Sequence, residues 1–493
     1  MGLRACKLIK EFAFRDVCPV EVYPCDIDGD GQLELIWLES AGIYQSKVYL
    51  NTSMPQIPAS NRSVFSLTAT NLEGEIFWQN ILKRPDRPDY YTHVADQMLW
   101  PGDFDEDGHL KLVAINQDRL MSIDAKSGNI KKIAKLPADN FNLVRGYKAA
   151  NGSGRLLVQN QERSYPPHYY GNPGVLVQGQ DLSFVTELAD VIGSGHSPRI
   201  FCPNENSGDL LIIGYSMFDS NGMKIAEMPF ERKKGGFSDI PGPIWCHSCQ
   251  MGRTSPCPDY CPPAEHVDQC AIRDINNDNK KEIVFAGSNC IYVTDDRLKL
   301  LWRYPAEHPQ HVLLGNFYTG NRPTPIIIFE ATNPPKIEAF DATGKLIKTS
   351  VIEMNWPVGK PEGVRDRMHG PEGILRMPQG GLRGEDVIVA DECGWPLILN
   401  PDGTKAVDLP CPDSSRQPPV VSGRGHDGHG YGYRVRIADF NNDGQVEILV
   451  HDRRYCWLFS FPFTADAISD EQRRIQPYTG QQLRGNYNKN SAS

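Results

Sequence analysis

The feature that most constrains the fold is an acidic loop that recurs four times between two apolar stretches. The four copies read CDIDGDGQLELIWL, GDFDEDGHLKLVAI, RDINNDNKKEIVFA and ADFNNDGQVEILVH, beginning at residues 25, 102, 273 and 438. Each copy is interpreted as a strand end, a polar D-x-[DN]-x-D loop and a second strand, because β-branched and other apolar residues follow the acids. The chain is therefore expected to be built from repeated strand–loop–strand units.

The acidic loops predict calcium sites. Side chains at alternate loop positions can point to one centre, and hard cations prefer oxygen ligands. The predicted ligands are Asp26, Asp28, Asp30 and Glu34 in the first loop, Asp103, Asp105 and Asp107 in the second, Asp274, Asn276, Asp278 and Glu282 in the third, and Asp439, Asn441, Asp443 and Glu447 in the fourth. The second loop has Lys111 where the others have Glu, which puts its site in doubt. The alternative is that these Asp-Gly loops are only tight turns. They are not EF-hands, because strands rather than helices follow.

Weaker copies complete a repeat along the whole chain. Four segments near 146, 202, 316 and 376 keep the strand–loop–strand rhythm without the acids, so that eight units recur every 40 to 80 residues. A tight turn between apolar runs, such as NLEGEIFW at 71 or DATGKLI at 341, follows most units and indicates an outer hairpin. Four short strands per unit predict an all-β fold, a single β-propeller spanning residues 1–493 with seven or eight four-stranded blades. Seven blades would result if a terminal strand were shared in closing the ring. We expect very little helix.

Composition excludes several partners. The formal net charge is −10 with His neutral, which argues against a nucleic-acid partner, since phosphate binding needs clustered Lys and Arg. No apolar run approaches the ~18 residues of a membrane-spanning helix, so we expect no membrane partner. The N-terminal residues lack the apolar core of a secretory signal and the myristoylation pattern. We expect a monomer.

Cysteines cluster in an insertion at about 240–265. Of thirteen cysteines, Cys246, Cys249, Cys257 and Cys261 read C-x2-C-x7-C-x3-C. One interpretation is a tetrahedral structural zinc site, for which His247 and His266 could also supply ligands. The alternative is one or two disulfides in a secreted loop.

A propeller binds its ligand at one face of the central channel, where the innermost strands begin. Histidines fall at or just before these strand starts, at His93, His196, His266, His308, His311, His369 and His426. Arg163, Tyr169, Tyr170 and Arg199 accompany them. Any one of them could be an ordinary hydrogen-bonded structural residue. Together they favour proton abstraction next to a carboxylate, because Arg pairs with carboxylates while His and Tyr can exchange protons. A hydrolase would need two facing carboxylates, and Glu265, Asp268 and Glu372 keep that reaction open.

The segments HSPRI, GYSMFD and EHVDQCAIRDINNDNKKEIVFAG, together with the terminal RGNYNKN, resemble β-propeller polysaccharide lyases. The resemblance covers residues from about 20 to 463 and extends to rhamnogalacturonan lyases with eight blades, ulvan lyases with seven, and L-rhamnose-α-1,4-D-glucuronate lyases. It implies β-elimination on an acidic glycan in which rhamnose neighbours a uronic acid, giving a 4,5-unsaturated uronate. Blade calcium and a structural zinc are also implied. Two departures leave the family open, namely the loops that have lost their acids and the Cys-rich insertion.

The resemblance also implies roles for the candidate residues. Arg163 or Arg199 would neutralise the uronate, and His196, His266 or Tyr170 would act as base or acid. Substrate contacts are expected from His93, His311, His369, Tyr169 and His426. The competing function is a non-catalytic adhesion or lectin propeller, since propellers readily carry binding alone. A polymeric substrate implies an extracellular or periplasmic location, although a cytoplasmic enzyme acting on short oligosaccharides is not excluded.

Overall fold

The fold is known from a computed structural model. It describes residues 4–14, 21–41, 63–82, 98–116, 118–137, 141, 143–159, 174–188, 191, 198–202, 208–228, 232–233, 236–237, 267–287, 290–306, 309–330, 332, 334–356, 370–376, 386–391, 394–412, 433–452 and 454–462. These residues form 36 strands and no helix. Within them, no segment has the length and apolar character of a membrane-spanning helix.

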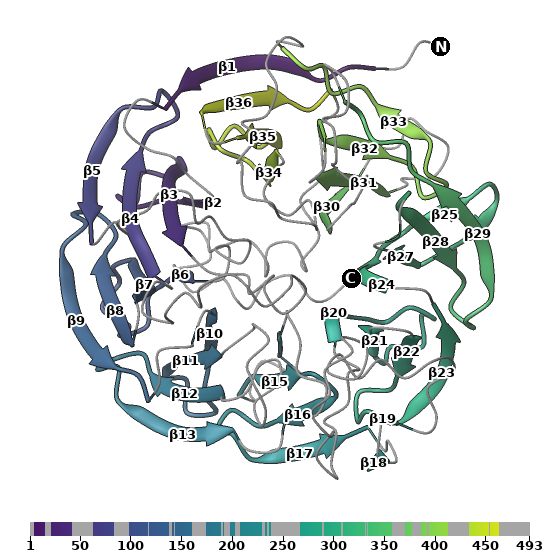
Figure 1. The fold of residues 1–493 in the computed structure, drawn as a ribbon, viewed down its shortest axis with the longest axis horizontal. Coiled ribbons are helices and arrows are strands. Elements are labelled where there is room, and N and C mark those ends of the chain that lie inside the picture. Colours follow the sequence, from purple (N-terminus) through teal and green to yellow (C-terminus); the bar gives the residue numbers. More distant parts are fainter. Residues whose placement is uncertain are drawn as a thin grey trace, which may run out of the picture.

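The described strands form a β-propeller of eight four-stranded blades, which confirms the all-β prediction (Figure 1). From the innermost strand outward, the first four blades consist of β2 (Glu21–Cys25), β3 (Glu34–Ala41), β4 (Ser63–Thr70) and β5 (Ile76–Ile81); β6 (Leu99–Gly102), β7 (Lys111–Asn116), β8 (Arg119–Asp124) and β9 (Ile130–Lys135); β10 (Leu143–Lys148), β11 (Gly154–Gln159), β12 (Gly174–Gln178) and β13 (Phe184–Leu188); and β14 (Arg199–Phe201), β15 (Leu210–Ile213), β16 (Ser216–Phe218) and β17 (Lys224–Glu227).

Blades 5 to 8 follow the same order. They consist of β20 (Val267–Arg273), β21 (Glu282–Gly287), β22 (Cys290–Thr294) and β23 (Leu300–Pro305); β24 (Pro309–Leu314), β27 (Ile326–Glu330), β28 (Lys336–Phe340) and β29 (Leu346–Val351); β30 (Gly370–Arg376), β31 (Asp386–Asp391), β32 (Leu397–Leu399) and β33 (Lys405–Val407); and β34 (Arg434–Ala438), β35 (Glu447–His451), β36 (Tyr455–Ser460) and β1 (Lys7–Ala13). Two small hairpins lie outside the blades, formed by β18 (Arg232–Lys233) with β19 (Gly236–Phe237) and by β25 (Tyr318–Thr319) with β26 (Arg322–Pro323).

The ring is closed by the two ends of the described chain. Strand β1 is the outermost strand of blade 8, where it runs antiparallel to β36 with Lys7 opposite Ser460 and Ala13 opposite Tyr455. The other three strands of this blade come from the C-terminal part of the sequence. All eight sequence repeats thus become separate blades, and the closing strand completes the eighth instead of reducing the number to seven.

Burial follows the position of each strand in its blade. The second strand β21 is buried along its whole length, whereas the outermost β1 alternates between exposed and half-buried residues. This contrast arises because the inner strands are covered on both sides by neighbouring blades, while an outermost strand reaches the rim. Large side chains fill the spaces between blades. Trp37 of blade 1 is fully buried and makes edge contacts with Phe14 and with His451 of blade 8.

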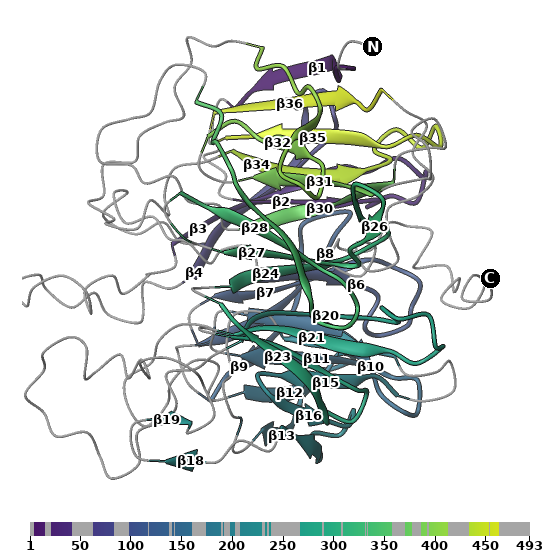
Figure 2. The ribbon, with the colours of Figure 1, turned by 90° about the vertical axis from the view of Figure 1, so that its right-hand side faces the viewer.

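The antiparallel order gives the disc two different faces, seen edge-on in Figure 2. The loops from the first to the second strand of each blade and the outer hairpin turns lie on one face. We call this the acidic-loop face. The outer turns predicted at 71 and 341 are there; in the second, the Asp341 carboxylate accepts hydrogen bonds from the amides of Thr343 and Lys345. The innermost strands begin at the opposite face.

Candidate functional site

The four acidic loops connect the first and second strands of blades 1, 2, 5 and 8. Each is nine residues long, and we number its positions from the first Asp. Position 2 is a buried apolar residue in every loop, namely Ile27, Phe104, Ile275 and Phe440. This residue anchors the loop to the core while its polar positions stay at the surface. A single local sequence pattern therefore produces the same loop in four blades.

Hydrogen bonds within each loop fix its shape. The carboxylate at position 1 accepts from two backbone amides; Asp439, for example, accepts from Asp443 at 3.1 Å and from Gly444 at 2.9 Å. The same bonds recur at Asp103 and Asp274, and Asp26 accepts from Gly29 and Gly31. In three loops the Glu at position 9 accepts from the amide at position 2, at 2.8 Å in blade 1, 3.0 Å in blade 5 and 2.9 Å in blade 8. The frame therefore holds the acids at positions 1 and 9 on the same short turn.

The turn requires a left-handed backbone at positions 4 and 6. Position 4 is Gly29, Glu106, Asn277 or Asn442, with φ between 57° and 86°. Position 6 is Gly31, Gly108, Asn279 or Gly444, with φ between 65° and 94°. Gly and Asn tolerate this conformation best, which explains their recurrence in the motif.

Replacing Gly31 with Ala tests how the first and eighth loops pack together. A Cβ atom at Gly31 would lie 2.6 Å from Nδ2 of Asn442 in the neighbouring blade, whereas a Cβ atom at Gly108 would have no neighbour within 4 Å. Both positions have positive φ, so Gly108→Ala measures the backbone cost alone, about 1 kcal/mol. We expect Gly31→Ala to lower the free energy of unfolding by slightly more than Gly108→Ala does, with a difference of less than about 1 kcal/mol, because only the exposed end of the Asn442 side chain must move. Equal losses in the two variants, measured by chemical denaturation, would contradict this packing.

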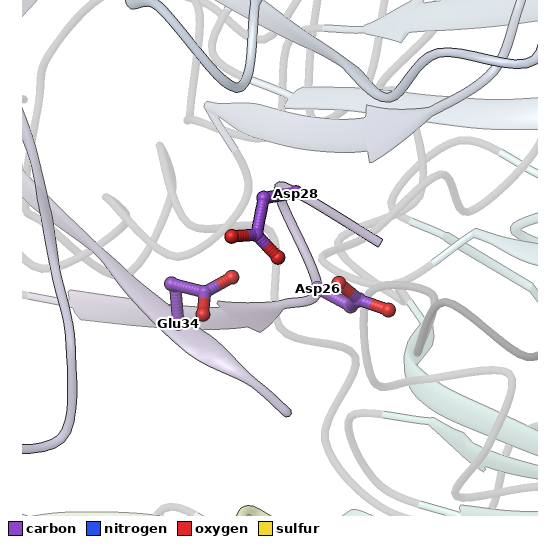
Figure 3. A group of neighbouring side chains, drawn as sticks. All are labelled: Asp26, Asp28 and Glu34. Carbon is purple, nitrogen blue, oxygen red and sulfur yellow. The ribbon is translucent and has the colours of Figure 1, made fainter. Parts of the chain in front are cut away.

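The first loop brings three acids together. One oxygen each from Asp26, Asp28 and Glu34 lies within 4.8 Å of the others, and these side chains come from the end of β2, the loop and the start of β3 (Figure 3). Asp26 and Glu34 are buried, and Asp28 is exposed. Asp103, Asp105 and Asp107 form a second such group in blade 2. These acidic clusters could hold a metal ion.

The Glu at position 9 is the loop acid whose ionised form is disfavoured by its surroundings. Burial raises the pKa of Glu34 to about 7, and the carboxylates of Asp28, Asp30 and Asp26 add to the rise. Burial likewise raises the pKa of Glu447 to about 7, with help from Asp443 and Asp439. The pKa of Glu282 is raised for the same reasons. A bound cation would offset the repulsion among these carboxylates.

Blade 2 departs from this pattern. Lys111 is buried at position 9, and its Nζ lies 2.6 Å from Oδ1 of Asp107 and 3.0 Å from Oδ1 of Asp105. The ammonium therefore sits inside the acidic group that was predicted as a calcium site.

Of the residues predicted to act on a substrate, the structure describes Arg199 and His311. The others lie outside the described residues, namely Arg163, His196, His266, Tyr170, His93, His369, Tyr169 and His426. The described strand ends that flank them in sequence all lie at the opposite face, because these positions precede innermost strands or follow a second strand. The described innermost strands thus all begin at the same end of the propeller.

Arg199 and His311 lie on innermost strands of nearby blades. Arg199 begins β14, and its Nε donates to the backbone carbonyl of Cys270 in β20. Gln269 of β20 in turn accepts a 2.8 Å hydrogen bond from the amide of Val312, next to His311. The innermost strands of blades 4, 5 and 6 are therefore tied side by side, with both predicted residues half-buried there.

Sequence reasoning missed a set of arginines on the innermost strands. Besides Arg199, the described innermost strands carry Arg145, Arg273, Arg376, Arg434 and Arg436, together with Lys148. The acids on the same strands are Glu21, Asp268 and Glu372. The described innermost strands thus carry more basic than acidic residues in a chain whose net charge is −10. The sequence contained a signal for them, since Arg273 directly precedes the acidic loop of blade 5 and Arg436 lies three residues before that of blade 8.

The predicted zinc ligands Cys246, Cys249, Cys257 and Cys261 lie outside the described residues. Among the cysteines that the structure describes, Cys6, Cys25 and Cys456 are buried free thiols. Zinc and disulfides both remain predictions for the Cys-rich insertion.

Comparison with known proteins supports the propeller fold. No protein-family model matches the sequence, and no curated protein matches it either. Among solved structures, the exotype rhamnogalacturonan lyase YesX is similar, with a TM-score of 0.52 and 13% identity over 94% of this chain and 75% of that one. Rhamnogalacturonan lyase YesW gives the same score and identity over 95% and 76%. The biofilm matrix protein Bap1 of V. cholerae gives a TM-score of 0.49 and 10% identity over 95% and 94%. The neighbours thus include lyases and a matrix protein.

Proposed function

We propose that this protein is a polysaccharide lyase that cleaves an acidic glycan containing rhamnose and uronic acid by β-elimination. The product would carry a 4,5-unsaturated uronate. The observation that carries the proposal is the excess of basic over acidic residues on the described innermost strands. Arg199 and Arg434 begin their strands, so they lie toward the opposite face, as do the acids Glu21 and Asp268.

The excess of basic residues on the innermost strands fits an anionic substrate. Positive charge on the walls of a channel attracts anions and raises their local concentration, whereas the acidic-loop face would repel them. Arginine stays charged at all relevant pH values and pairs with carboxylates through two parallel hydrogen bonds. A uronate polymer would therefore approach the propeller from the opposite face.

The proposed reaction needs three groups near that face. Arg163 or Arg199 would neutralise the uronate carboxylate, which makes the C5 proton acidic. His196, His266 or Tyr170 would remove this proton, and a second such group would protonate the glycosidic oxygen as its bond to C4 breaks. Arg199 already donates one hydrogen bond to Cys270, and a guanidinium has five donor N–H groups. His311 and the other predicted histidines and Tyr169 would contact the sugar rings.

We also propose that the loops of blades 1, 5 and 8 bind structural calcium. Their donors are carboxylate or amide oxygens at positions 1, 3, 5 and 9, which is the ligand chemistry that calcium prefers. The raised pKa of Glu34 and of Glu447 fits the same assignment, since both carboxyl groups are buried and also lie near other carboxylates. The residues present thus fit the ion, which would stabilise the blades. Zinc in the Cys-rich insertion and a location outside the cytosol remain parts of the proposal.

A binding propeller is the second candidate, and one observation favours it. The arginines whose contacts are defined hold neighbouring blades together: Arg199 bonds Cys270, Arg273 bonds Asn316, and Arg436 bonds Glu21. The role of such arginines could be purely structural, in holding the blades of the ring together. An adhesion or lectin function would then need no reacting groups.

The two functions separate on matched substrates. A lyase should release unsaturated product from a rhamnose- and uronate-containing glycan such as ulvan or rhamnogalacturonan I, and none after the carboxylates are reduced to alcohols, because the C5 proton is then no longer acidic. Product is followed by its ultraviolet absorbance. Retained binding to either glycan without any product would favour the binding propeller.

A further inference from the structure

The acidic loop of blade 2 contains its own cation. Lys111 stands at position 9, where the other three loops have Glu, and is only 5% exposed. A buried lysine is costly unless it is paired and hydrogen-bonded. Here its ammonium is paired within a loop that would otherwise carry several unbalanced carboxylates.

The contacts of the ammonium match the places where a metal would find its ligands. Nζ lies 3.0 Å from Asp105 at position 3 and 2.6 Å from Asp107 at position 5, and it donates to the carbonyl of His109 at position 7 at 3.1 Å. Carboxylates at alternate positions and a backbone carbonyl at position 7 are the oxygen donors typical of loop calcium sites. A second ammonium, that of Lys132 on β9, lies 3.6 Å from the other oxygen of Asp105.

The charge of the loop agrees with this geometry. Positions 1, 3, 5 and 9 hold four acids in blade 1 and three acids in blades 5 and 8, whereas blade 2 holds three acids and a lysine. The Lys111 ammonium forms ion pairs with both Asp105 and Asp107, so two of the three acids have a counter-charge within the loop.

We propose that Lys111 replaces the metal ion in blade 2, so that the propeller has three metal-dependent acidic loops and one that is metal-independent. This rests in part on the proposed calcium sites of blades 1, 5 and 8. Blade 2 keeps the same backbone frame as they do, including the two amide bonds to Asp103. What differs is the source of the positive charge.

The test is the number of calcium ions bound per chain. The intact protein is dialysed against calcium and its bound metal is measured by mass spectrometry of the elements. We expect three ions in the wild type, four in Lys111→Glu, and two in the control Glu34→Gln. Four ions in the wild type, or no gain in Lys111→Glu, would overturn the proposal.

A second measurement is needed if no calcium binds at all. In that event the calcium proposal fails, and the role of Lys111 is tested by measuring melting temperatures in the presence of a chelator. Lys111→Met should lower the melting temperature by several degrees, because Asp105 and Asp107 lose their counter-charge, and the matched Lys131→Met should leave it unchanged within about a degree. Lys131 is exposed on β9 of the same blade, and its Nζ lies 3.7 Å from its acidic partner, Asp124. Equal melting temperatures for the two variants would overturn the assignment of Lys111.

Discussion

Replacing Arg436 with Ala should lower the free energy of unfolding by about 3–5 kcal/mol, the cost of breaking a buried ion pair on one side. Arg436 of blade 8 donates through Nη2 to Glu21 of blade 1 and through Nε to the carbonyl of Val22 at 3.1 Å. The side chain of Glu21 is 1% exposed and that of Arg436 is 11% exposed. Removing the guanidinium would leave the Glu21 carboxylate buried without its counter-charge at the seam where the ring closes.

A matched control spans the same two blades. Lys10 of β1 pairs with Glu73 in the outer turn of blade 1, but these side chains are 34% and 56% exposed. Water screens such a pair, so Lys10→Ala should cost no more than about 1 kcal/mol. The double variant Glu21→Gln/Arg436→Met should recover part of the loss, because no charge is left unpaired. Free energies from chemical denaturation give the answer, and similar losses for Arg436→Ala and Lys10→Ala would show that the buried pair does not hold the seam.

Chelation should destabilise the protein, and more strongly as the pH rises. In the metal-free fold the pKa of Glu34 and of Glu447 is about 7, against an ordinary value of 4.5. These groups therefore favour folding at low pH, and the metal-free fold loses stability as the pH rises from about 4.5 to about 7. Calcium opposes that loss because it favours the ionised carboxylates. The difference in melting temperature between calcium and chelator should thus be small near pH 5 and largest above pH 7.

The size of this effect follows from mass action. Each occupied loop contributes about 2.7 kcal/mol when free calcium is a hundredfold above its dissociation constant. Glu34→Gln serves as the control and should remove about a third of the difference, since the three loops lie in separate blades and should act additively. Melting curves at several pH values make the measurement. A difference that shrinks with rising pH would refute the electrostatic account of these loops.

The local parts of the fold were predictable from sequence, and the long-range parts were not. The first and second strands of all eight blades flank the positions that the sequence repeat predicts for their connections. This local prediction succeeds because the acidic loops and outer turns are held by hydrogen bonds between residues at most seven apart, such as Ile27 and Glu34. Ring closure depends on β1 pairing with β36, across most of the chain. Backbone pairing carries no local signature of its partner, so seven and eight blades could not be distinguished from sequence.

The candidate site shows the same division. The acidic loops were recognised from residue type and spacing. In sequence, Lys111 is recognised only as a replacement of the Glu found in the other loops. Its proposed function depends on the position of its ammonium beside Asp105 and Asp107, which only the structure shows. The inner-strand arginines form a pattern only when strands from different blades are placed around one channel. The roles of the predicted base, acid and neutraliser stay predictions, with Arg199 and His311 now placed on innermost strands.

The most direct test of the proposed function is to incubate the protein with a uronate-containing glycan and to measure the masses of the products. Elimination breaks the bond to C4 without adding water, so the account predicts an unsaturated uronate end on one fragment, which lacks one water relative to the product of hydrolysis. Two saturated fragments that together contain one added water would identify a hydrolase, and an intact polymer with folded protein would leave only binding. Either of these results would contradict the lyase.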